Sequence, residues 1–192
     1  MPHIRLPSGH ELRPLEESDA EELYRLIDAN RARLKRWMAW AEGQTRDRTL
    51  EFIRAGRRQI GADDGFQSAI LGEDGIVGVA GFHGVDWPNR ATSLGYWLAA
   101  GQEGRGTMTH AVRALVDHGF GRWGLNRVEI RADVENLRSR ALAERLGFVY
   151  EGTLRQALRL ADGFHDDVVY SMLAADWAGV ARPGAGGAPR AV

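Results

Sequence analysis

The chain of 192 residues contains no cysteine. This absence excludes disulfide bonds, thiolate ligands for a metal and a cysteine nucleophile. The sequence also lacks a run of 18 apolar residues, so we expect no membrane-spanning helix and no membrane partner. A charged segment followed by an apolar stretch, typical of a secretory signal, is missing from its first residues. A chain without such a signal and without disulfides is expected in the cytoplasm.

An excess of charge of one sign is also missing. The 25 basic residues nearly balance the 26 acidic ones, and the net charge is −1. Since nucleic-acid-binding domains are usually basic, we expect no nucleic-acid partner. The length favours one domain. The sequence from residue 178 is rich in glycine, alanine and proline, so we expect a folded domain over 1–177 and a disordered tail over 178–192.

Hydrophobic periodicity and turn residues predict a mixed α/β domain of the α+β kind. The first third predicts a strand pair over 3–15, a helix from a capping box at Ser18 to Asn30, a helical stretch through Leu34, Trp37 and Met38, and a helix over 47–60. The rest predicts strands over 66–71, 76–83, 92–98, 127–132, 148–155 and 168–173, and helices over 107–123 and 138–146.

A glycine-rich segment joins the expected strand 92–98 to the expected helix 107–123. It contains Gly104-Arg105-Gly106 immediately before that helix. Unpaired amides at a helix N-terminus and glycines without side chains suit a bound phosphate group, although a simple turn would use the same glycines. The P-loop pattern is absent. A dinucleotide fingerprint, which would indicate nicotinamide binding, is also absent, because it needs glycine at position 109 and the chain has Thr109 there.

A second segment decides between these possibilities. It begins with Asn136-Leu137-Arg138-Ser139 and continues to a Leu-Gly-Phe run at 146–148. In this order after the glycine-rich segment, the motif resembles the GNAT acetyltransferase superfamily. The run Gly-Tyr-Trp-Leu at 95–98 and the ending Gly163…His165…Asp167…Tyr170 make the chain most similar to the RimJ/RimL-like N-terminal acetyltransferases. The resemblance extends over about residues 10–177.

The resemblance implies the GNAT acyl-CoA N-acyltransferase fold, with a mixed, mostly antiparallel central sheet of about six to seven strands flanked by helices. It implies acetyl-CoA as the cosubstrate and no metal. The residues that would bind acetyl-CoA are Trp97, Leu98, Glu103, Gly104, Arg105, Gly106, Thr107, Met108, Thr109, Asn136 and Arg145. Arg138 and Arg140 are further candidates for its phosphates, or parts of a solvated helix face.

The same resemblance implies direct attack of an amine on the thioester. Ser139 is placed to supply a proton to the leaving thiolate, and it could also cap a helix. His83 and Asp86 are candidates for relaying the proton of the amine through water, although His83 could equally be a structural strand residue. Leu158 stands where a RimL-like enzyme carries a glutamate base, and Ala143 where many GNAT enzymes carry a tyrosine acid.

The expected acceptor follows from the missing carboxylate base, since Leu158 stands where a RimL-like enzyme carries a glutamate. An α-amino group has a pKa of about 7.7–8.0, against about 10.4 for lysine, so it needs less help to lose its proton. We therefore expect a protein or peptide N-terminus as acceptor, with Trp37, Trp40 and Asp86 as candidate contacts. The alternatives are a small-molecule amine (an antibiotic, an amino acid conjugate or a polyamine) and a non-catalytic acyl-CoA-binding module. The resemblance also implies a homodimer formed through the C-terminal strands.

Overall fold

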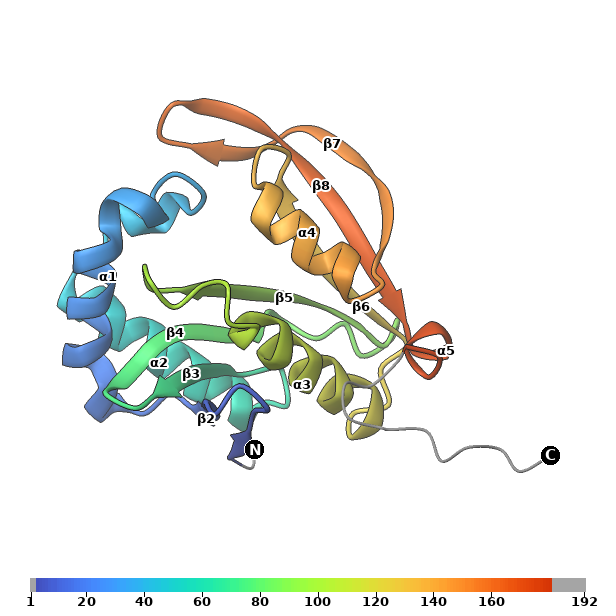
Figure 1. Ribbon diagram of the computed structural model, residues 1–192, viewed down its shortest axis with the longest axis horizontal. Helices are drawn as coiled ribbons and strands as arrows, with labels where there is room; N and C mark the ends of the chain where they lie inside the picture. The colour runs from blue at the N-terminus through green and yellow to red at the C-terminus, as the bar shows by residue number, and fades with distance from the viewer. Residues whose placement is uncertain (1–2, 181–192) are drawn as a thin grey trace.

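The computed structural model describes residues 3–180, in which eight strands form one sheet in the order β1-β2-β3-β4-β5-β6-β8-β7 (Figure 1). The strands are β1 Ile4–Arg5, β2 Glu11–Pro14, β3 Gln67–Gly72, β4 Gly75–Phe82, β5 Ala91–Leu98, β6 Arg127–Asp133, β7 Val149–Leu160 and β8 Gly163–Leu173. The helices are α1 Ala20–Leu34, α2 Arg46–Gly61, α3 Thr107–Gly121, α4 Leu137–Arg145 and α5 Ala174–Trp177, with short 3-10 turns η1 Glu17–Asp19 and η2 Ala39–Ala41.

Within the described residues, neighbouring strands are antiparallel except for β5 and β6, which run parallel. The expected mixed, mostly antiparallel GNAT sheet is therefore confirmed. It has eight strands instead of six to seven, because the β1–β2 hairpin joins the same sheet through β3. No helix in residues 3–180 combines the length and apolar composition needed to cross a membrane.

Helices cover both faces of the sheet, as strand alternation requires. Leu94 and Leu98 of β5 point into the core beneath α3 and α4, whereas Trp97 points into the core beneath α1 and α2. The larger core contains buried side chains of α3 such as Leu115, and the smaller one contains Ile53 of α2. The central strand β5 therefore presents side chains to two separate cores.

The structure corrects several expected boundaries near the N-terminus. The capping box joins Glu16 and Asp19 around η1, so Ser18 is not the cap. Helix α1 continues past Asn30 because this side chain is buried and donates to the carbonyl of Leu26 one turn earlier, at 2.8 Å. The helical stretch expected through Trp37 is mostly a turn, with only η2 as helix.

The C-terminal strands are longer than expected. Strand β7 continues to Leu160 through a bulge at Gln156, whose φ is 52° and whose amide donates to Asp166 at 2.9 Å. Strand β8 begins at Gly163 instead of 168. Val180 packs against the larger core and bonds to the carbonyl of Trp177. The rest of the tail expected over 178–192, from residue 181 on, lies outside the described residues.

Candidate active site

The sheet opens between its two parallel strands. Pairing of β5 with β6 runs from Ala91 to Leu94 and stops there, while β5 remains paired with β4 as far as Leu98. The amide of Ala99 donates to the carbonyl of Val77 on β4, and the carbonyl of Ser93 accepts from the amide of His83, which follows β4. By alternation, the N–H and C=O groups of Tyr96 and Leu98 point away from β4, toward the opening.

A cavity of about 1870 Å³ occupies this opening. Its lining brings together most residues expected in the site. The expected site residues that line it are Trp37, Trp40, His83, Trp97, Leu98, Glu103, Gly104, Gly106, Thr107, Met108, Thr109, Asn136, Ser139 and Arg145. Arg105 is exposed and Asp86 lies elsewhere, so neither is part of the lining.

One end of the cavity is the N-terminus of α3. Gly104 and Gly106 have φ values of 79° and 75°, a conformation that favours glycine, and no side chain caps the helix. Thr109 accepts a hydrogen bond from Arg145 at 3.2 Å. Nearby, His110 Nδ1 is buried without a hydrogen-bond partner among the described residues. The first amides of α3, which have no intrahelical partner, fit a bound pyrophosphate.

Ser139 lies in the first turn of α4, on the β6 side of the opening. Asn136 caps this helix, since its Oδ1 accepts from the amide of Ser139 at 3.2 Å. The cap is therefore Asn136, and the Ser139 hydroxyl is left for another partner. That partner is Tyr96, whose hydroxyl lies 2.9 Å from Ser139 Oγ. Burial raises the pKa of Tyr96 to about 12, against the lowering effect of this hydrogen bond.

His83 follows β4 and reaches across to β5. Its Nδ1 is 2.8 Å from Ser93 Oγ, and its Nε2 lies beside Gly95, where a Cβ atom would come within 2.7 Å. Burial, and to a smaller extent the charge of Arg131, lower the pKa of His83. This shift favours the neutral imidazole. When Nδ1–H donates to Ser93, Nε2 has a free lone pair at the edge of the cavity.

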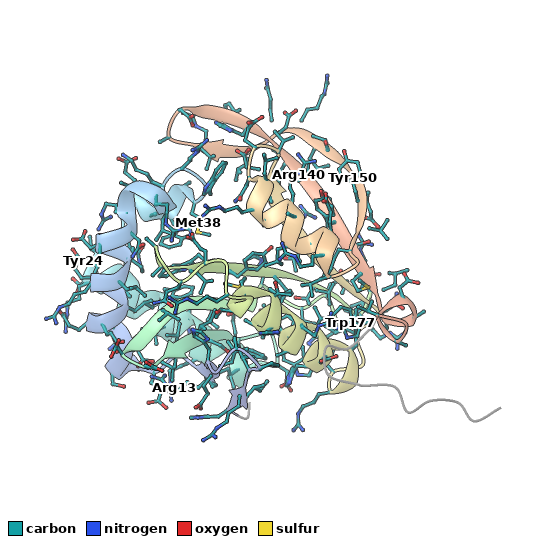
Figure 2. All side chains as sticks on the ribbon, in the orientation of Figure 1. Arg13, Tyr24, Met38, Arg140, Tyr150 and Trp177 are labelled. Carbon is teal, nitrogen blue, oxygen red and sulfur yellow. The ribbon has the colours of Figure 1, made fainter. Side chains whose placement is uncertain are left out.

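Part of the cavity has an aromatic wall. Trp37 and Trp40 line it from the connection between α1 and α2, which also carries Met38 (Figure 2). Trp40 is 43% exposed, and its ring lies 6.5 Å from that of Trp97. Leu158 lines the cavity from β7. This part of the cavity could receive an apolar or aromatic part of an acceptor.

Asp86, expected near the acceptor, does not reach the cavity. Its carboxylate accepts hydrogen bonds from the amide and the side chain of Asn89, at 3.0 and 2.7 Å, in the turn before β5. These bonds lower the pKa of Asp86. The guanidinium of Arg140 is engaged in hydrogen bonds outside the cavity, to Val134 O at 2.8 Å and to Tyr170 Oη at 3.3 Å. Neither residue is free to bind a substrate here.

Sequence reasoning missed the residues that hold the walls together. Asn30 accepts from Ala100 N at 2.8 Å, where the glycine-rich segment begins. Arg31 donates to three carbonyls of the α1–α2 connection, those of Ala41, Glu42 and Gln44. Its neighbour on the same helix turn, Arg33, bonds to Leu98 O and to Glu103, which also pairs with Arg138 at 3.1 Å. In the sequence, the asparagine near the end of the expected helix was the one signal that could have indicated such a contact.

Among residues 3–180, no group of three or more histidine, aspartate or glutamate side chains is arranged to hold a metal ion.

Comparison with known proteins identifies the family. Residues 11–149 match the acetyltransferase (GNAT) domain. The chain belongs to the GNAT acetyltransferase family. It is 39% identical over 170 residues to the putative ribosomal N-acetyltransferase YdaF of Bacillus subtilis, covering 88% of this chain and 93% of that protein.

Two solved structures are similar over nearly the whole fold. RimL, a ribosomal L7/L12 alpha-N-protein acetyltransferase in complex with coenzyme A, gives a TM-score of 0.85 at 28% identity, covering 90% of this chain and 98% of that chain. The microcin C7 self-immunity acetyltransferase MccE, in complex with acetyl-CoA and AMP, gives a TM-score of 0.80 at 30% identity, covering 88% and 98%. The RimJ/RimL-like resemblance is confirmed, and this GNAT protein is an acetyl-CoA-dependent N-acetyltransferase.

The glycine turn before α3 gives a direct test of the phosphate end. Replacing Gly106 by alanine should strain a left-handed residue by about 1–2 kcal/mol and displace the loop amides. We expect the Kd for acetyl-CoA, measured by calorimetry, to rise about tenfold, which corresponds to about 1.4 kcal/mol. Gly9→Ala is the control, since Gly9 has a φ of 82° in the β1–β2 turn. Equal binding by both variants would contradict a phosphate site at this loop.

Proposed function

We propose that this chain acetylates the α-amine of a protein or peptide N-terminus by direct attack on acetyl-CoA in a ternary complex. The observation that supports the proposal is one cavity that both His83 and Ser139 line. His83 follows β4, with its Nδ1 2.8 Å from Ser93 Oγ of β5, whereas Ser139 lies on α4, 2.9 Å from the Tyr96 hydroxyl. The pantetheine arm would bind the backbone groups of Tyr96 and the N–H of Leu98, whose carbonyl accepts a hydrogen bond from Arg33. Acetyl-CoA supplies the activated acetyl group.

The residues of this chain then divide the proton transfers. The amine must be neutral to attack, and His83 Nε2 would accept the proton that the amine loses, directly or through one water. The Leu98 N–H faces the opening and would stabilise negative charge on the thioester oxygen. Ser139 Oγ–H would supply a hydrogen bond or a proton to the sulfur, because a free thiol has a pKa of about 8.5. The Glu103–Arg138 pair borders the phosphate end of the same cavity.

The base favours an α-amine. A histidine whose pKa is lowered is a weak base, and the carboxylate of RimL-like enzymes is replaced by Leu158, which lines the cavity. An α-amine, with a pKa of about 7.7–8.0, is partly neutral already, whereas lysine at about 10.4 is not. The names of YdaF and RimL, which refer to ribosomal proteins, support a protein acceptor.

A second acceptor class is a small amine. The aromatic wall of Trp37 and Trp40 favours it, since exposed rings can stack on a planar group, and MccE is described with AMP beside acetyl-CoA. Release of CoA from acetyl-CoA should be measured with three sets: peptides with free N-terminal Ser, Ala, Met or Gly, the same peptides blocked but containing lysine, and small amines including an aminoacyl nucleotide analogue.

We expect turnover on free N-termini alone, with mass spectrometry locating the acetyl group on the α-nitrogen. Turnover on small amines alone would contradict the proposed acceptor and support the second class. Intact acetyl-CoA binding with no turnover in any set would contradict both proposed acceptor classes.

The histidine assignment predicts a pH effect. Because the pKa of His83 is lowered below 6.5, the base is active at pH 7 and is lost only as the pH falls through that lower value. His83→Gln should lower kcat about 10²-fold and abolish this acidic limb in the profile of kcat against pH. The control is His3→Gln, since His3 is exposed and paired with Glu11. An unchanged acidic limb in His83→Gln would show that another group is the base.

We also infer a cytoplasmic homodimer, in keeping with relatives that modify ribosomal proteins. Exposed apolar side chains on the C-terminal strands support an interface there: Tyr150 on β7 is 51% exposed (Figure 2), and Phe164 on β8 is 62% exposed. Light scattering should give twice the mass of 21.2 kDa, and Phe164→Arg should shift the population toward monomer. A monomer at all concentrations would contradict this assignment.

A further inference from the structure

Tyr96 lies partly buried on β5, and its hydroxyl has one polar neighbour among the described residues, Ser139 Oγ at 2.9 Å. The two residues come from opposite sides of the opening, 43 positions apart in the chain. The ring packs against the larger core, which fixes where the hydroxyl lies. Both side chains line the cavity.

The direction of this hydrogen bond matters for the chemistry. A serine hydroxyl has one hydrogen that rotates and two acceptor positions. Because burial keeps the Tyr96 hydroxyl protonated at any working pH, the tyrosine is available as the donor. The amide of Ser139 is bonded to Asn136, so helix capping does not use the Ser139 hydroxyl. With Tyr96 donating, the hydrogen of Ser139 is free to point into the cavity.

We propose that Tyr96 is a positioning residue, which donates to Ser139 Oγ and thereby directs the Ser139 hydrogen toward the sulfur of the leaving CoA. This inference rests on the proposed role of Ser139. In the reaction the C–N bond forms and the C–S bond breaks, and the amine gives up one proton to His83 or water. The CoA sulfur leaves as a thiolate that accepts a hydrogen bond from Ser139 and takes its proton from solvent. Tyr96 keeps its own proton throughout.

The alternative is that Tyr96 only fills space in the core. Tyr96→Phe keeps the ring and removes the hydroxyl, so it separates the two roles. A positioning role predicts a fall in kcat of about five- to tenfold, the effect of one hydrogen bond, with an unchanged Kd for acetyl-CoA. A packing role predicts a changed melting temperature and an unchanged kcat.

A double-mutant cycle tests whether Tyr96 acts through Ser139. Ser139→Ala should lower kcat about 10²-fold, and adding Tyr96→Phe to that variant should lower it no further. Equal factors for Tyr96→Phe in both backgrounds would overturn the proposal. Tyr150→Phe is the control, because that hydroxyl is bonded to Thr153 on the exposed strand β7.

A measurement without any acceptor keeps this inference separate from the proposed function. The thiolate of bound CoA absorbs ultraviolet light, and this chain has no cysteine, so after subtraction of a protein blank the signal reports CoA alone. A directed Ser139 hydrogen should lower the thiol pKa of bound CoA below its free value of about 8.5. We expect that pKa to rise in Tyr96→Phe and in Ser139→Ala. Equal thiol pKa values in wild type and Tyr96→Phe would overturn the proposal, even if the acceptor proved to be a small amine.

Discussion

The separation of β5 from β6 after Leu94 is the constraint on which the site depends. Backbone groups inside a protein need hydrogen-bond partners, and a strand edge left without one is a template for an extended ligand. Here the edge at Tyr96 and Leu98 faces a cavity, and the helix that follows supplies amides for a phosphate. A single break in pairing therefore creates the opening in which we propose that the acyl-CoA arm and the amine bind.

The last turn of α1 supports several parts of the cavity wall. Asn30 binds the start of the glycine-rich segment, Arg31 binds the connection that carries the aromatic wall, and Arg33 bonds to the carbonyl of Leu98. Each contact gives a hydrogen-bond partner to a backbone group that would otherwise lack one. The last turn of α1 therefore supports both the glycine-rich segment and the aromatic wall.

Local patterns allowed much of this to be predicted from the sequence. The strand, glycines and helix around 92–123 and the Asn136 motif are continuous in sequence, and both were expected in the site. The partners of Tyr96 and Arg33 lie 43 and 70 positions away, and no periodicity identifies them. The prediction that Asp86 contacts the acceptor was wrong for the opposite reason. Its carboxylate accepts hydrogen bonds from Asn89 in a local turn and does not reach the cavity.

The most direct test of this account is a crystal structure of the protein with CoA. The account predicts pantetheine amides bonded to the backbone of Tyr96 and Leu98, the pyrophosphate on the amides that open α3, and the sulfur within hydrogen-bonding distance of Ser139 Oγ. Binding of CoA outside the opening between β5 and β6, or a sulfur beyond the reach of Ser139, would contradict it.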